Sequence, residues 1–497
     1  MRKWWMLLLL TLTVNTNSLW AAPVFDFNPT CQKAYKELVQ LRIAHGEALI
    51  AEARAQNPEN LIVDYLEGYV HFFILFFNEN PAEYGWRKAR FEAIIEKLAD
   101  GPTNNPWYLY TRSVVHLQKA VVAIKFSERW SAGWDLRKAF MLVKDNRKKY
   151  PTFVPNDLIY GPVQVAAGVI PDGYKWLASL FGLKGSVKTG MSIMRNLVDA
   201  KDAWGKFYQE EANFYYCYLQ FYVENKQQET IRYIQQRQLD VVNNHLYAYL
   251  ASNLGINSKN TDYARTVITK RNQSNDYLNT PVWDFEMGFV RLHHLEYAEA
   301  AKHYDSFLRQ FKGKFYVKDA AQKLSWCYYL QGNMAAANTA RQWVLSKGGT
   351  DTDADKKAYK DAKTGKWPHP LLLKARLLND GGYNKEAITL LHGKTANDFE
   401  SEAEQLEFVY RVARIYDELG KDEEAIQFYL KAIQLGEQRT EYFAARAALQ
   451  LGMLYEAKGQ KELAIQYFER CIAMDDHEYK DSLDQRAKSG IARCKGL

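Results

Sequence analysis

The fold is decided by residues 407–474, which contain one pattern twice, as YRVARIYDELGKDEEAIQFYL (410–430) and as LQLGMLYEAKGQKELAIQYFE (449–469). When Gly420 is placed over Gly459, small residues coincide with small residues and rings with rings. Small side chains are needed where two helices touch, whereas large rings fill the space between them. A self-repeat of this length predicts helix–turn–helix units that stack on one another.

The coinciding pairs indicate which repeat this is. They are Ala413 with Gly452, Tyr416 with Tyr455, Ala425 with Ala464, and Tyr429 with Phe468. Their order and spacing resemble the tetratricopeptide repeat. The resemblance implies an all-α chain, an α-solenoid of helix–turn–helix units that binds a partner and carries no chemistry. We therefore expect more than roughly 60% helix and almost no strand, against roughly one-third helix in an average soluble protein.

The same register continues, in weaker form, over residues 281–497. Its alanine position recurs at Ala300, Ala337, Ala387, Ala425 and Ala464. The step between Ala337 and Ala387 is longer than the others, which predicts an insertion at 347–370. A last helix from Asp481 to Lys495 is expected to cap the solenoid, because its free side is charged.

The chain before residue 281 is predicted to be helical without a clear repeat. Residues 22–200 form an N-terminal helical region, and its Pro- and Gly-rich stretch at 150–190 is expected to form a packed crossover of short helices. A membrane-surface hairpin is the alternative for that stretch. Residues 201–280 continue as helical hairpins. The very apolar segment from Leu61 to Phe77 is interrupted by acids and a histidine, so a helix buried between neighbours is favoured over a membrane span.

The N-terminus predicts export. Residues 1–21 begin with the basic Arg2 and Lys3, continue as a short apolar run and end in a small-residue cleavage site at Ala21, which is the organisation of a secretory signal peptide. The apolar run is too short to span a bilayer, which favours cleavage over an uncleaved anchor. We expect a periplasmic protein or one at the outer membrane and cell surface, and an association with the envelope membrane stays open.

Two further resemblances are carried by parts of the chain. The exported N-terminus together with the repeats from about Pro281 onward resembles secreted, uncharacterised tetratricopeptide proteins of Bacteroidetes-type bacteria. The stretch at 150–190 resembles, over a short length, a eukaryotic tetratricopeptide family that includes inclusion-body-clearance proteins. Neither resemblance supplies a function.

Charge and motif content exclude several classes of function. The formal net charge of +7 falls to +5 (7 − 2) when Arg2 and Lys3 leave with the signal, which is too little and too dispersed for a nucleic-acid-binding protein. The stretch from Gly182 to Thr189 resembles a phosphate-binding loop but has Val187 where the motif requires glycine. No Gly-x-Ser-x-Gly elbow or Cys/His pairing indicates a nucleophile. We expect no enzyme, no cofactor, no small-molecule substrate and no nucleic-acid partner.

Metal binding is not indicated either. The five cysteines form no CxxC pair, and those in helical patterns are expected to be small buried hydrophobes, with a bridge between Cys471 and Cys494 as the alternative. Asp351, Asp353 and Asp355 have the alternate spacing of a calcium loop, but the turn glycine and the bidentate glutamate of such a loop are missing. These aspartates are expected to form the solvated start of a helix.

Side chains left over after core packing are expected to line the concave face, where tetratricopeptide stacks bind their partners. Transferring the repeat positions one by one gives a candidate site of Phe285, Gln322, Trp326, Tyr329, Arg376, Asn379, Tyr410, Arg414 and Asp417. Rings beside arginines commonly anchor extended ligands, so we expect a protein or peptide partner in this groove. The alternative is a cell-surface glycan-binding protein of the starch-utilisation type, in which rings such as Trp204 and Tyr215 would stack on sugars.

Overall fold

The computed structural model describes residues 22–169 and 185–496. Within these ranges helix accounts for 75% of the residues, and the only strand-like contact is a single bridge between Val24 and Asn60. The prediction of an all-α chain is therefore confirmed. The signal peptide predicted at 1–21 lies outside the described residues.

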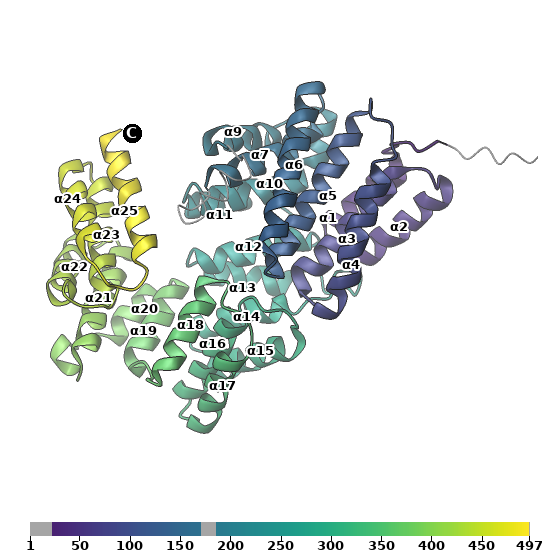
Figure 1. Cartoon of the computed structure of the whole chain (residues 1–497). Helices are drawn as coiled ribbons and strands as arrows, with labels where there is room; N and C mark the ends of the chain where they lie inside the picture. Colours follow the sequence, from purple (N-terminus) through teal and green to yellow (C-terminus); the bar gives the residue numbers. More distant parts are fainter. Residues whose placement is uncertain (1–21, 170–184, 497) are drawn as a thin grey trace, which may run out of the picture.

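The helices of the first half pack mainly on their neighbours along the chain and appear in Figure 1 in purple to green-blue. In order they are α1 (Pro29–Val39), α2 (Ile43–Gln56), α3 (Leu61–Asn78), α4 (Pro81–Leu98), α5 (Pro106–Lys125), α6 (Arg129–Lys149), α7 (Pro155–Gly168), α9 (Val187–Val198), α10 (Ala203–Tyr222), α11 (Gln227–Gln236), α12 (His245–Asn257) and α13 (Thr261–Lys270).

Three of these helices begin at the same dipeptide, Asn-Pro. Asn28, Asn80 and Asn105 each stand at the N-cap, where the side chain accepts a hydrogen bond from a backbone N–H of the first turn, and proline follows. Proline fits there because its missing N–H would have no partner in the helix. Each such cap typically contributes about 1 kcal/mol, so local sequence sets where these helices start.

α3 contains the very apolar segment from Leu61 to Phe77, and it lies in the core. Tyr65 and Tyr69 are 0% and 1% exposed, and the buried Asp64 accepts hydrogen bonds from Arg54 at 3.0 Å and Lys97 at 3.3 Å. Among the described helices, α3 alone is long and apolar enough to cross a membrane, but 72% of it is buried inside the protein. The prediction of a helix buried between neighbours is confirmed.

The stretch at 150–190 provides α7 and the start of α9, and its residues 170–184 lie outside the described ranges. α7 and α9 pack on each other and lie between α6 and α10. They approach closely because glycine stands at the contact, where a Cβ on Gly190 would lie 2.5 Å from the carbonyl oxygen of Gly161. Ser186 caps α9, so Lys188 and Thr189 of the phosphate-loop-like sequence lie in its first turn.

The second half continues the stack in green to yellow and curves, so that α25 lies across from α9 and α11 in the view of Figure 1. In order its helices are α14 (Val282–His293), α15 (Tyr297–Gln310), α16 (Val317–Leu330), α17 (Met334–Ser346), α18 (Asp353–Thr364), α19 (Pro370–Gly381), α20 (Asn384–Leu390), α21 (Glu402–Glu418), α22 (Asp422–Gly436), α23 (Phe443–Ala457), α24 (Lys461–Ala473) and α25 (Lys480–Lys495).

The two clear repeats are the helix pairs α21–α22 and α23–α24. Ala425 and Ala464 are fully buried where the second helix of each pair closes on the first, and so are the rings of Tyr429 and Phe468. All five cysteines are buried and free. The expectation of small buried hydrophobes is therefore confirmed, and the alternative bridge between Cys471 and Cys494 is not formed.

The insertion at 347–370 forms α18, an additional helix that packs against α16 and α17. Asp355 holds it there, because its carboxylate accepts backbone hydrogen bonds from Tyr316 at 2.7 Å and Asp319 at 3.0 Å, at the start of α16. Asp355 is 0% exposed, so the expectation of a solvated aspartate is wrong for this residue. Thr352 caps α18.

Candidate functional site

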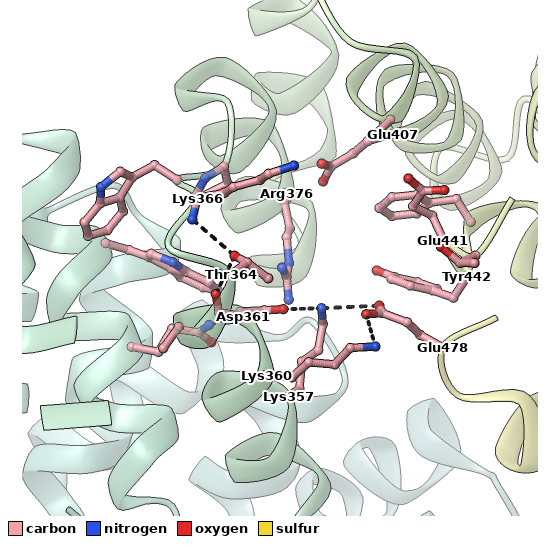
Figure 2. A pocket seen from close by; sticks show the side chains of 18 of the residues that line it. Lys357, Lys360, Asp361, Thr364, Lys366, Arg376, Glu407, Glu441, Tyr442 and Glu478 are labelled. Carbon is pink, nitrogen blue, oxygen red and sulfur yellow. Dashed lines mark hydrogen bonds and ion pairs between the residues drawn. The ribbon is translucent and has the colours of Figure 1, made fainter. Parts of the chain in front are cut away.

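A cavity of about 560 Å³ lies between helices of the C-terminal half. It is bounded by α16, α18, α19 and α21 and by the segments that precede α23 and α25 (Figure 2). Gln322, Trp326 and Arg376 of the sequence-derived site line this cavity together, although they come from α16 and α19. The structure thus brings one part of the predicted groove to one place.

Arg376 occupies the centre of the cavity. Its guanidinium carbon lies 5.3 Å from the ring centroid of Trp326, and its Nε lies 3.4 Å from the carboxylate of Asp380 on the next turn. The Arg376 side chain keeps 32% of its surface exposed, so the pairing with Asp380 leaves the guanidinium open toward the cavity. A cation stacked on a ring and partly exposed can still bind a carboxylate with two hydrogen bonds.

One wall of the cavity is basic and comes from the insertion. Lys357, Lys360 and Lys366 line it, and two of these lysines reach the segment before α25, where Glu478 lies 3.3 Å from Lys357 Nζ and 2.8 Å from Lys360 Nζ. Burial opposes the charge on Glu478, but the Lys360 and Lys357 ammonium groups hold its pKa below the usual range. Burial also disfavours the charged form of Lys357, but the carboxylates of Asp361 and Glu478 outweigh this effect and raise its pKa above the usual range.

The opposite wall carries acids and rings. Figure 2 shows Glu407, Glu441, Tyr442 and Glu478 across from the lysines, with Arg376 between the two sides. Arg411, which is 6% exposed, pairs with Glu407 at 2.8 Å. The backbone N–H of Glu478 donates to the carbonyl of Thr440 at 3.2 Å, which fixes the segment before α25 beside the segment before α23.

Two predicted residues on α21 do not face the cavity. Tyr410 is 2% exposed because α23 packs over it, and its ring lies 5.2 Å from that of Phe443. Arg414 is held within its own helix, at 3.2 Å from Asp417 and 2.6 Å from Glu418. The expectation that Tyr410 and Arg414 point into one surface with Trp326 is therefore wrong.

Four other predicted residues are also engaged elsewhere. Asp417 accepts a hydrogen bond of 2.7 Å from the buried Tyr429 hydroxyl. Asn379 is 3% exposed and donates to Asn384 at 2.7 Å. Tyr329 donates to the carbonyl of Pro368 at 3.0 Å, and its ring stacks on Trp367 at a centroid distance of 4.7 Å. Phe285 lines a different cavity.

The rings predicted to bind sugars under the glycan alternative also pack against other residues of the protein. The ring of Trp204 stacks on Phe27 and on Tyr208 at centroid distances of 5.9 Å and 6.0 Å. Tyr215 donates its hydroxyl to the buried Glu211 at 2.8 Å. Both rings therefore pack in the N-terminal core.

Sequence reasoning missed the lysines of α18 and the segment before α25. The signal was present, since the polar insertion carries Lys357 and Lys360 one turn apart, but repeat positions cannot place a helix that lies outside the repeat. Among the described residues, no three His, Cys, Asp or Glu side chains are close enough together to hold a metal ion.

Residues 405–476 match the family model for the tetratricopeptide repeat. Two solved structures align with most of the chain. The TPR domain of P58(IPK) aligns at 15% identity with a TM-score of 0.23, and the alignment covers 87% of this chain and 98% of that one. The APC/C hetero-tetramer Cut9-Hcn1 aligns at 12% identity with a TM-score of 0.27, and the alignment covers 91% of this chain and 95% of that one. No curated protein matches the chain. The family match thus identifies residues 405–476 as tetratricopeptide repeats, a class of repeat that serves as a scaffold for binding other proteins.

Proposed function

We propose that this chain is an exported, non-enzymatic scaffold that holds an extended segment of a protein partner in the cavity around Arg376. The observation that carries the proposal is the juxtaposition of Trp326 and Arg376 from two successive units in one solvent-accessible cavity. Buried rings and arginines at the centre of a concave surface typically supply most of the binding energy of an interface.

The charges around the cavity indicate what kind of segment fits. The lysines of α18 face the acids Glu407, Glu441 and Glu478, with Arg376 between them (Figure 2). A segment that carries both acidic and basic side chains can pair with each wall, whereas a uniformly charged one is repelled by one of them. We therefore propose an extended peptide of mixed charge as the ligand.

The test uses purified protein and displayed random peptides. Peptides selected on the wild type are measured again with Trp326→Ala combined with Arg376→Ala, which should weaken binding at least tenfold, since each lost anchor typically costs about 1–2 kcal/mol. Lys302→Ala is the control, because this side chain is 71% exposed on α15. Circular dichroism should show unchanged helix content. Equal affinities of the double variant and the wild type would refute the cavity as the binding site.

The glycan alternative predicts different behaviour in salt. An arginine- and lysine-dependent complex should weaken as salt rises to about 1 M, where screening acts within about 3 Å. Retention of a polysaccharide should change little under the same conditions. Export is tested separately, by expressing the full chain in a bacterial host and sequencing the N-terminus of the product recovered outside the cytoplasm.

A further inference from the structure

A second cavity adjoins the first and is lined mainly by aromatic rings. Its volume is about 530 Å³, and its lining includes seven Phe and four Tyr residues from α3, α10, α12, α14 and α15 and the segment before α16. Lys323 lines this second cavity, and its ammonium lies 5.5 Å from the ring of Phe289 and 5.0 Å from that of Trp326, which lines the first cavity. We call this second space the aromatic cavity.

Core packing does not account for all of these rings. Tyr222 is 52% exposed and Tyr316 is 42% exposed, although both line the aromatic cavity. A tyrosine left half in solvent at the mouth of a cavity retains apolar surface that a ligand can cover. Phe285, which the repeat positions had assigned to a binding surface, also lies here.

The charges of the aromatic cavity do not balance. Three carboxylates line it. Glu79 pairs with Lys125 at 2.8 Å, and Asp319 pairs with Lys323. Glu286 has no cation partner within the described ranges, so one carboxyl group of the cavity is left without a counter-ion.

Glu286 is nevertheless buried, with 2% of its surface exposed. Its Oε1 accepts one hydrogen bond of 2.9 Å, from the amide of Asn253. The Asn253 oxygen in turn accepts a hydrogen bond from the Tyr222 hydroxyl at 3.3 Å, which orients the amide toward the carboxylate. Burial raises the pKa of Glu286 to about 7, as expected for a carboxylate that lacks a neighbouring cation.

The rings of this cavity already contact ammonium groups. Lys125 Nζ lies 4.8 Å from the ring centroid of Phe76 and 4.9 Å from that of Phe315. These distances are within the range of about 6 Å in which the face of a ring attracts a cation. The same rings therefore suit a ligand that carries an ammonium group.

We infer that the aromatic cavity binds an aliphatic ammonium group on an apolar stem, with Glu286 as its counter-ion. The rings remove the stem from water, and the carboxylate replaces the hydration that the ammonium loses. The ammonium can belong to a free alkylamine or to a lysine side chain of a protein segment. This site is independent of the peptide cavity proposed above, because no residue that carries the argument lines that cavity.

The test compares a cation with its neutral isostere by isothermal titration calorimetry. The wild type should bind hexylammonium at least tenfold more tightly than 1-hexanol. Glu286→Gln should remove that preference, and Tyr222→Ala, a change at an exposed position, should weaken hexylammonium binding. Glu299→Gln is the control, since this carboxylate is 49% exposed on α15, and it should keep the preference.

A second arm identifies the source of the ammonium. A blocked Gly-Lys-Gly peptide is compared with its norleucine analogue, and a preference for lysine that Glu286→Gln abolishes assigns a protein segment as the ligand. If the preference appears only with hexylammonium, the ligand is a free amine. Equal binding of hexylammonium and hexanol by the wild type, binding of neither, or a preference that survives Glu286→Gln would each overturn the inference.

Discussion

Replacing Gly452 by alanine places one methyl group at a close helix contact of the C-terminal repeats. A Cβ at Gly452, on α23, would lie 2.5 Å from Cδ1 of Phe468 on α24. The ring cannot retreat, because its other edge faces α25, where a Cβ on Gly490 would lie 2.5 Å from Cε2. Phe468 is fully buried between the two glycines, so the added methyl must displace a helix or distort the ring.

The magnitude follows from two opposing terms. Alanine in a helix interior is favoured over glycine by about 1 kcal/mol, whereas overpacking a close-packed core costs about 1–3 kcal/mol. The net effect of Gly452→Ala on the free energy of unfolding is therefore a loss of up to about 2 kcal/mol. The matched control is Gly85→Ala on α4, where an added Cβ meets nothing within 4 Å, so the gain of about 1 kcal/mol is unopposed.

The assay must detect local as well as global unfolding, because units of a solenoid can unfold separately. Urea titration followed by circular dichroism gives the change in stability, and hydrogen exchange shows where it falls. In Gly452→Ala the amides of α23 to α25 should exchange faster than in the wild type, whereas in Gly85→Ala no segment should. If Gly452→Ala is as stable as Gly85→Ala, the close packing inferred around Phe468 is wrong.

Two further predictions concern buried carboxylates. Asp355→Ala removes the acceptor of two backbone N–H groups and should destabilise the contact between α18 and α16 by about 1–3 kcal/mol. The amides of Tyr316 and Asp319 should then exchange their hydrogens faster. Asp353→Ala is the control, because this side chain is 88% exposed, and it should change stability by less than about 0.5 kcal/mol. The folded-state pKa of Glu286, about 7, exceeds its ordinary value of 4.5, so its contribution to stability is complete below pH 4.5 and is lost as pH rises through 7. The loss of stability amounts to about 3 kcal/mol, and Glu286→Gln should abolish this pH dependence. Urea titrations of the wild type and Glu286→Gln measure it. A difference in their free energies of unfolding that stays constant from pH 4.5 to 8 would contradict the prediction.

The fold could be read from the sequence where local rules repeat. The pairs Ala425 with Ala464 and Tyr429 with Phe468 recur because every unit meets the same packing problem, and each is buried as the register requires. The Asn-Pro dipeptides start helices by a local mechanism that does not depend on tertiary contacts. Such features are visible in a single sequence.

The site was less predictable because it depends on departures from the repeat. Transfer of positions assumes that each unit presents the same face, and it holds for Trp326 and Arg376. It fails for Tyr410, where α23 covers the ring, and for Arg414, whose charge is neutralised one turn away. No periodicity could indicate that an inserted helix would supply the basic wall.

In the proposed complex, the inserted helix also determines how the partner reaches the cavity. The concave face of a regular repeat stack is open along its length, but here Lys357 and Lys360 on α18 extend to Glu478 before α25 and close one side (Figure 2). Ion pairs at such partly exposed side chains are typically worth about 0–1 kcal/mol each. Breaking both ion pairs of Glu478 therefore costs at most about 2 kcal/mol. A ligand can offset this cost by pairing its own carboxylate with the two lysines. An acidic side chain in the bound segment would thus enter where Glu478 now lies, while Asp355 keeps α18 in place.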